Sequence, residues 1–176
     1  MEIGHDSGKR GGMDRIVAVE NIYAEDIYAT ASRRIDSSAG YAGDLTPEEA
    51  WSLLKSDSDA ILVDVRTAAE WSYVGVPDLS AIGREPVFAQ WLLAPAMKEN
   101  PNFFDELNAR GVTPDKAAIF ICRTINRSPK AARALTAKGF PRCYFLLEGF
   151  EGSLDESNHR GARDGWKAAG LPWIQG

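Results

Sequence analysis

The sequence predicts an α/β domain built on a parallel sheet. Three short runs have the length and the apolar composition of buried strands: AILVDV at 60–65, AAIFIC at 117–122 and CYFLL at 143–147. Helical patterns separate these runs, and strands that alternate with helices are typical of a parallel sheet. The chain has 176 residues, which is enough for one domain with a full hydrophobic core.

The N-terminal part differs in composition from the rest. Residues 1–13 are polar and glycine-bearing and predict a mobile tail, whereas apolar residues recur at helical spacing over 14–34. The stretch DSSAGYAGD at 36–44 has the composition of a connector. We therefore expect an N-terminal tail and helix at 1–40, followed by the main domain at 41–176.

Three helices of the main domain have recognisable ends. The first, over 46–56, begins with TPEE: a hydroxyl N-cap, a proline at the first helical position and a glutamate that completes a capping box. The second covers part of 96–110 and stops at Gly111. The third runs over 128–138 and stops at Gly139.

The overall composition argues against several classes of function. A formal net charge of -5 gives no general attraction to nucleic acid or to anionic membranes. No stretch approaches the roughly 18 apolar residues of a membrane span, and the N-terminus lacks the apolar core of a signal peptide. A globular protein of the cytoplasm is the expectation that follows.

The chain contains two cysteines and two histidines: Cys122, Cys143, His5 and His159. They form no closely spaced pairs, so we expect no metal site, and no motif indicates a cofactor. The count alone would permit a disulfide, but free thiols are the expectation for a cytosolic chain.

Cys122 is the candidate nucleophile. It ends a strand, and ligands of open α/β sheets bind beyond the carboxyl ends of the strands. The helix that begins at Ser128 directs its unpaired N–H groups toward this loop, while Arg123 and Arg127 add positive charge that favours a thiolate. The backbone N–H groups of the four residues between Cys122 and Arg127 would form a nest for an anion.

A plainer interpretation stays open at this point. Many free cysteines are small buried apolar residues, and Cys122 could simply end its strand in that way. Cys143 fits this plainer interpretation better, because no helix-opening loop follows it.

Three separated motifs resemble the rhodanese family. CRTINRS at 122–128 is similar to the family's active loop, usually written Cys-Arg-Ser-Gly-x-Arg-Ser. LVDVRTAAEW at 62–71 is similar to its upstream strand and turn, and LLEGFEG at 146–152 with GWKAAGLPW at 165–173 to its C-terminal signature. The resemblance spans about residues 41–174. It implies a rhodanese-like fold, in which helices flank both faces of a five-stranded parallel sheet.

The resemblance also implies the activity of a thiosulfate sulfurtransferase. The Cys122 thiolate would attack the outer sulfur of thiosulfate or a similar donor, release sulfite and become a persulfide. Cyanide or a thiol would then accept that sulfur. The implied partners are a small sulfur-containing anion and this acceptor, with a sulfur-relay protein as a further candidate. The sequence indicates no particular oligomeric state.

The resemblance assigns roles to individual residues. The residues expected to contact the donor, by side chain or by backbone N–H, are Arg123, Thr124, Ile125, Asn126, Arg127 and Ser128. Arg127 is expected to act mainly in the structure of the loop. Asp64 and Arg66 are supporting residues that order the neighbouring turn. Separately, the i, i+4 spacing of Arg66 and Glu70 predicts an ion pair with a mainly structural role.

The length of the loop from Cys122 to Arg127 helps to distinguish a sulfurtransferase from a phosphatase. Four residues between Cys122 and Arg127 make a six-residue loop, which in this superfamily accompanies sulfur chemistry. Related phosphatases have one more residue, so a phosphatase or an arsenate reductase is disfavoured. Ile125 stands where the family commonly has glycine and would be strained if that position needed positive φ. A non-catalytic rhodanese-like binding or regulatory module therefore stays open.

The polar stretch at 151–164 is longer than in shorter rhodanese domains. A solvated surface loop is the favoured interpretation. The alternative is that it flanks the active-site mouth and uses His159, Arg160 or Arg163 to select a donor or partner.

Overall fold

A five-stranded parallel sheet lies at the centre of the computed structural model, which describes residues 23–176. Its strand order is β1-β8-β7-β2-β4. The strands are β1 (Gly43–Leu45), β2 (Ala60–Asp64), β4 (Val87–Phe88), β7 (Ala117–Ile121) and β8 (Cys143–Leu146). The predicted α/β class and five parallel strands are thus confirmed. In the β2–β7 register Asp64 lies opposite Ile121, so the segments after these two strands leave the sheet side by side.

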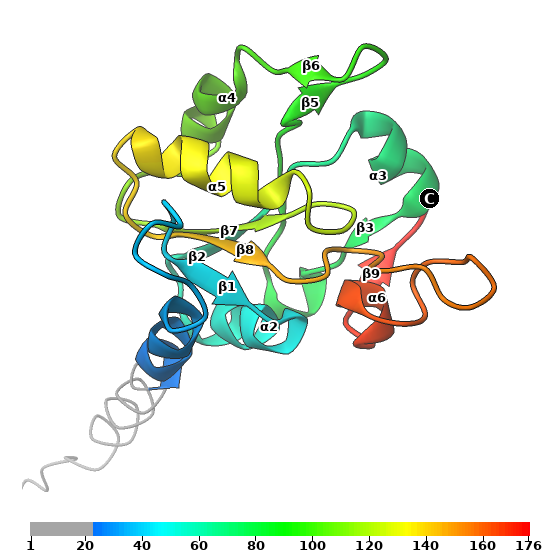
Figure 1. The fold of residues 1–176 in the computed structure, drawn as a ribbon, viewed down its shortest axis with the longest axis horizontal. Coiled ribbons are helices and arrows are strands. Elements are labelled where there is room, and N and C mark those ends of the chain that lie inside the picture. Colours follow the sequence, from blue (N-terminus) through cyan, green and yellow to red (C-terminus); the bar gives the residue numbers. More distant parts are fainter. Residues whose placement is uncertain (1–22) are drawn as a thin grey trace, which may run out of the picture.

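Helices cover both faces of the sheet, as predicted (Figure 1). They are α2 (Pro47–Ser56), α3 (Ala68–Val74), α4 (Phe103–Ala109), α5 (Ser128–Ala137) and α6 (Gly165–Ala168), with a 3-10 turn at Ser80–Ile82. Leu62 and Ile119 face the core shared with α2 and α6, whereas Val63 and Phe120 face the core shared with α4 and α5. Neighbouring strand residues thus alternate between two hydrophobic cores.

The predicted ends of two helices are confirmed. At α2 the Thr46 hydroxyl accepts a hydrogen bond from the Glu49 N–H at 3.2 Å, and the Glu49 carboxylate accepts one from the Thr46 N–H at 3.0 Å. At the end of α5, Gly139 adopts φ of 94°, a conformation that glycine tolerates best. Residues close in sequence therefore determine the start of α2 and the end of α5.

One segment differs from its prediction. The connector expected at 36–44 contains the start of β1, which has only three residues and shows no periodicity. Gly43 lets this strand approach the N-terminal helix, because a Cβ there would lie 2.6 Å from the Ala31 carbonyl carbon. The helix predicted for part of 96–110 is confirmed as α4, and Gly111 follows it with φ of 80°. The first part of that range belongs to a hairpin.

Two small antiparallel pairs complete the fold. They are β5 (Leu92–Leu93) with β6 (Lys98–Glu99), and β3 (Val76–Pro77) with β9 (Trp173–Ile174). The second pair joins the segment after α3 to the C-terminal segment. None of the helices in residues 23–176 has the length and apolar composition to cross a membrane.

The helix predicted over 14–34 is confirmed over 23–32, whereas the expected tail at 1–13 and residues 14–22 lie outside the described part. Ile27 and Ala31 of this helix are buried, and the Tyr28 hydroxyl donates a hydrogen bond to Asp57 at 2.6 Å. The helix therefore packs against the main core, and the division of the chain at residue 40 stays a prediction.

A buried ion pair closes the carboxyl end of β2. Asp64 and Arg66 are both fully buried, with 2.6 Å between Oδ2 and Nη2. The same Nη2 donates to the Gly75 carbonyl oxygen at 2.8 Å, which fixes the turn after α3. The guanidinium also lies 4.1 Å from the centre of the Phe150 ring, within the range of a cation–π contact.

Replacing Asp64 by Asn should strongly destabilise the fold, because it leaves the buried Arg66 cation without its counter-charge. We expect the free energy of unfolding, measured by urea denaturation, to fall by about 3 kcal/mol. The control is Lys116→Gln, which removes the cation of a partly exposed pair with Asp59 and should change stability little. Equal effects of the two substitutions would contradict this account.

Candidate active site

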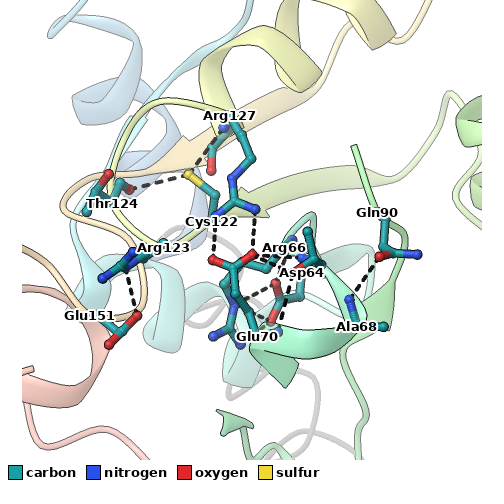
Figure 2. A network of polar contacts seen from close by, with 12 residues as sticks. Asp64, Arg66, Ala68, Glu70, Gln90, Cys122, Arg123, Thr124, Arg127 and Glu151 are labelled. Carbon is teal, nitrogen blue, oxygen red and sulfur yellow. Dashed lines mark hydrogen bonds and ion pairs between the residues drawn. The ribbon is translucent and has the colours of Figure 1, made fainter. Parts of the chain in front are cut away.

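Cys122 directly follows β7 and opens the loop that leads into α5 (Figure 2). Its Sγ accepts a hydrogen bond from the Ser128 N–H at 3.4 Å and lies 3.5 Å from the Thr124 carbonyl oxygen. Ser128 is the first residue of a ten-residue helix, so the sulfur lies at the positive end of a helix dipole. The side chain is nearly buried, with 1% of the residue exposed.

The loop carries a row of unpaired backbone donors. Within residues 23–176, the N–H groups of 123–127 make no hydrogen bond, and the buried Ser128 hydroxyl also lacks a partner. Successive N–H groups that lack protein partners are available to an anion. Among the described residues, the Ser128 N–H is the backbone donor that contacts the sulfur, and the nest of 123–126 around Cys122 stays a prediction.

The backbone strain considered for Ile125 is not present, because this residue does not have the positive φ that would favour glycine. In the described part of the chain, the non-glycine residues with positive φ are Met97, Glu148 and Asn158. Ile125 therefore has an ordinary backbone conformation. Ile125 is 52% exposed and is not one of the residues that line the cavity beside Cys122.

The segment after β8 supports the loop through its backbone. The Phe150 N–H donates to the Cys122 carbonyl oxygen at 2.8 Å, and the Glu151 N–H donates to that of Arg123 at 3.0 Å. Gly149 permits this approach: it adopts φ of 72°, and a Cβ there would lie 2.6 Å from the Cys122 carbonyl oxygen. The LLEGFEG motif thus positions the cysteine loop.

Arg127 braces the far end of the loop. Its two terminal nitrogens each lie 2.6 Å from an oxygen of Glu70 in α3, as Figure 2 shows. Burial would raise the pKa of Glu70, but the hydrogen bonds from Arg127 and from the Thr67 N–H outweigh it and lower this pKa to about 2. The structural role expected for Arg127 matches this geometry.

The ion pair expected between Arg66 and Glu70 is wrong. Arg66 pairs with Asp64, and Glu70 pairs with Arg127. The i, i+4 rule applies only where both residues belong to one helix, and α3 begins at Ala68. Arg66 precedes that helix and is directed into the core.

A cavity of 490 Å³ opens beside Cys122. Its lining residues are Thr67, Glu70, Leu92, Ala94, Met97, Cys122, Arg123, Thr124, Asn126, Arg127 and Arg160. The hairpin of β5 and β6 supplies an apolar part of the wall, which no sequence motif indicated. Within the 151–164 segment, Arg160 lines this cavity, whereas His159 and Arg163 do not. The selection of a donor by this segment stays a prediction.

The three arginines of the cavity differ in their charge partners. Arg123 lies 3.1 Å from Glu151, and Arg127 is paired with Glu70. Arg160 donates from Nη1 to the Gly152 carbonyl oxygen at 2.6 Å but makes no ion pair within residues 23–176.

Cys143 has a different environment. Both cysteines are free thiols, as expected, but Cys143 begins β8 inside the core, and burial raises its pKa to about 11. At neutral pH it is therefore protonated and inert. No group of three His, Cys, Asp or Glu side chains in the described chain is placed to hold a metal ion.

The parallel sheet, with a cysteine loop between β7 and α5, defines a rhodanese-like protein. Residues 43–176 match the family model of the STR4 middle domain, and the chain belongs to this family.

Several relatives match most of the chain. An uncharacterized protein of Rickettsia conorii is 36% identical over 128 residues, which cover 71% of this chain and 91% of that protein. Rhodanese-like domain-containing protein 4 of Arabidopsis thaliana, a chloroplastic protein, is 25% identical over 73% of this chain and 25% of its own length.

Solved structures show the same fold. The crystal structure of Rv0390 from M. tuberculosis has a TM-score of 0.70 and 50% identity, over 77% of this chain and 99% of that one. The polysulfide-sulfur transferase homodimer of Wolinella succinogenes has a TM-score of 0.50 and 19% identity, over 98% of this chain and 95% of that one. The second likeness concerns the fold alone.

Replacing Gly149 by Ala should displace the Cys122 loop. Gly170→Ala is the matched control, because Gly170 has a similar φ of 69°, but a Cβ added there would have no atom of another segment within 4 Å. Both substitutions carry backbone strain, and only Gly149→Ala adds a clash. We expect it to lower the free energy of unfolding by about 2 kcal/mol more than the control. Equal losses in thermal or urea denaturation would contradict the close approach.

Glu70→Gln should remove a pH-dependent contribution to stability. Because the pKa of Glu70 is about 2 in the folded protein and near 4.5 when unperturbed, the ionised carboxylate stabilises the fold fully above pH 4.5. This stabilisation is lost as the pH falls toward 2. We expect a deficit of roughly 2 kcal/mol at pH 7, since solvent screens part of the pair, and a much smaller deficit near pH 3.

The control for Glu70 is Glu48→Gln, at an exposed glutamate in the first turn of α2 that makes no ion pair within the described residues. Its difference from the wild type should vary little with pH. A deficit of Glu70→Gln that stays constant between pH 7 and pH 3 would be inconsistent with the proposed charge pair.

Proposed function

We propose that the protein is a sulfurtransferase that carries a sulfane sulfur as a persulfide on Cys122. The observation that supports this most is the position of Sγ, 3.4 Å from the first N–H of α5 and at the head of a loop with unpaired backbone donors. Such donors stabilise an anionic sulfur without any rearrangement of side chains. The cavity beside Cys122 gives a donor access to it.

In the first step the Cys122 thiolate attacks the outer sulfur of thiosulfate. A new S–S bond forms, the old S–S bond breaks, and sulfite leaves with the electron pair. The terminal sulfur of the persulfide is then an anion, which the N–H groups of 123–127 and Ser128 can bind. Thr124, Ile125 and Asn126 contribute through their backbone in this proposal.

In the second step an acceptor thiolate or cyanide attacks the terminal sulfur. The persulfide S–S bond breaks, and Cys122 recovers its electron pair as a thiolate. A small sulfur-containing anion is therefore the proposed donor, and a thiol or cyanide is the proposed acceptor. A sulfur-relay protein is a further candidate for either role.

The arginines have separate roles in this proposal. Arg127 holds the loop through Glu70, and Arg123 shares its charge with Glu151, so neither presents a full unpaired charge to the donor. Asp64 and Arg66 support the site from within the core.

The proposal is tested by loading the sulfur. After incubation with thiosulfate, intact mass spectrometry should show one added sulfur atom on the wild-type protein. Cys122→Ser should abolish the adduct, and Cys143→Ser, which replaces the inert thiol, should retain it. No adduct with thiosulfate or polysulfide would support a non-catalytic binding module instead. Cys122-dependent hydrolysis of an aryl phosphate would support a phosphatase.

A further inference from the structure

Arg160 is distinguished by its charge environment. Of the three arginines that line the cavity, Arg123 and Arg127 have carboxylate partners, at 3.1 Å and 2.6 Å. Arg160 has no such partner within residues 23–176. Its one hydrogen bond, to the Gly152 carbonyl oxygen, orients the guanidinium but leaves its positive charge uncompensated. An anion in the cavity would therefore find its strongest attraction there.

The rest of the cavity lining indicates that the ligand also has an apolar part. Leu92, Ala94 and Met97 give it an apolar wall, on the hairpin of β5 and β6. A volume of 490 Å³ lies within the range of about 300–1,000 Å³ typical of sites for organic ligands. Inorganic thiosulfate has no apolar part to use such a wall.

Given the sulfurtransferase function proposed above, we propose that the site takes an organic sulfane-sulfur donor with an anionic group. Arg160 binds that group, the hairpin packs against the organic part, and the outer sulfur reaches Cys122. Arg160 is thus a specificity-determining residue supplied by the 151–164 segment. With a thiosulfonate donor, the Cys122 thiolate bonds to the outer sulfur, the donor's S–S bond breaks, and a sulfinate leaves with the electron pair.

The experiment compares two donors that differ by one charge: benzenethiosulfonate and para-carboxybenzenethiosulfonate. The wild type should use the carboxylated donor with the higher kcat/KM. Arg160→Gln should lower kcat/KM for the carboxylated donor by about tenfold or more, and change it by less than about twofold for the other donor. Arg160→Lys, which keeps the charge, should restore part of the preference.

Arg163→Gln is the matched control, because it removes the same charge from the same segment at an exposed residue outside the cavity. It should leave both donors and their ratio unchanged. As a second measurement, calorimetry should show that para-carboxybenzenesulfinate binds Cys122→Ser more tightly than benzenesulfinate, and that adding Arg160→Gln removes the difference.

Equal use of the two donors by the wild type, or equal losses for both in Arg160→Gln, would overturn the role of Arg160. In either case thiosulfate would still load Cys122, and the sulfurtransferase function would stand. If neither thiosulfate nor the thiosulfonates load Cys122, the proposed function fails, and the inference fails with it.

Discussion

The buried contact between Asp64 and Arg66 underlies the arrangement of the site. It fixes the end of β2, and the same guanidinium contacts the Gly75 carbonyl and the Phe150 ring. Phe150 in turn donates its N–H to the Cys122 carbonyl. One charge pair thus connects three segments that are far apart in sequence. Burying two charges is costly, so this geometry depends on both partners being present.

The ion pair between Arg127 and Glu70 limits how much positive charge the site can offer to a ligand. The sequence predicts that Arg127 both attracts a donor and shapes the loop, and its bidentate contact with Glu70 favours the second role. Arg123 is similarly occupied by Glu151. Positive charge near a cysteine in the sequence therefore does not equal charge available to a ligand, because acidic residues from other segments compensate it.

The sequence revealed those parts that local patterns determine. β2, β7 and β8 are apolar runs of four or five residues, and the capping box of α2 lies within four consecutive residues. β1 and β4 are too short to show a period. The partners of Arg66 and Glu70 depend on where α3 begins, and Glu70 meets Arg127 across 57 residues of chain. Arg160 and the hairpin of β5 and β6 reach the cavity only because the tertiary fold brings distant segments together, so no local pattern in the sequence could indicate it.

The support that Gly149, Phe150 and Glu151 give to the cysteine loop has an evolutionary consequence. Phe150 and Glu151 donate their N–H groups to the carbonyl oxygens of Cys122 and Arg123, and the ion pair of Glu151 also involves Arg123. These contacts therefore do not depend on which side chains stand at 124–126. Those positions are free to change as ligand preference diverges, provided that the loop keeps its length and the supporting turn keeps its glycine. Proteins built in this way can acquire new ligands while the cysteine stays where it is.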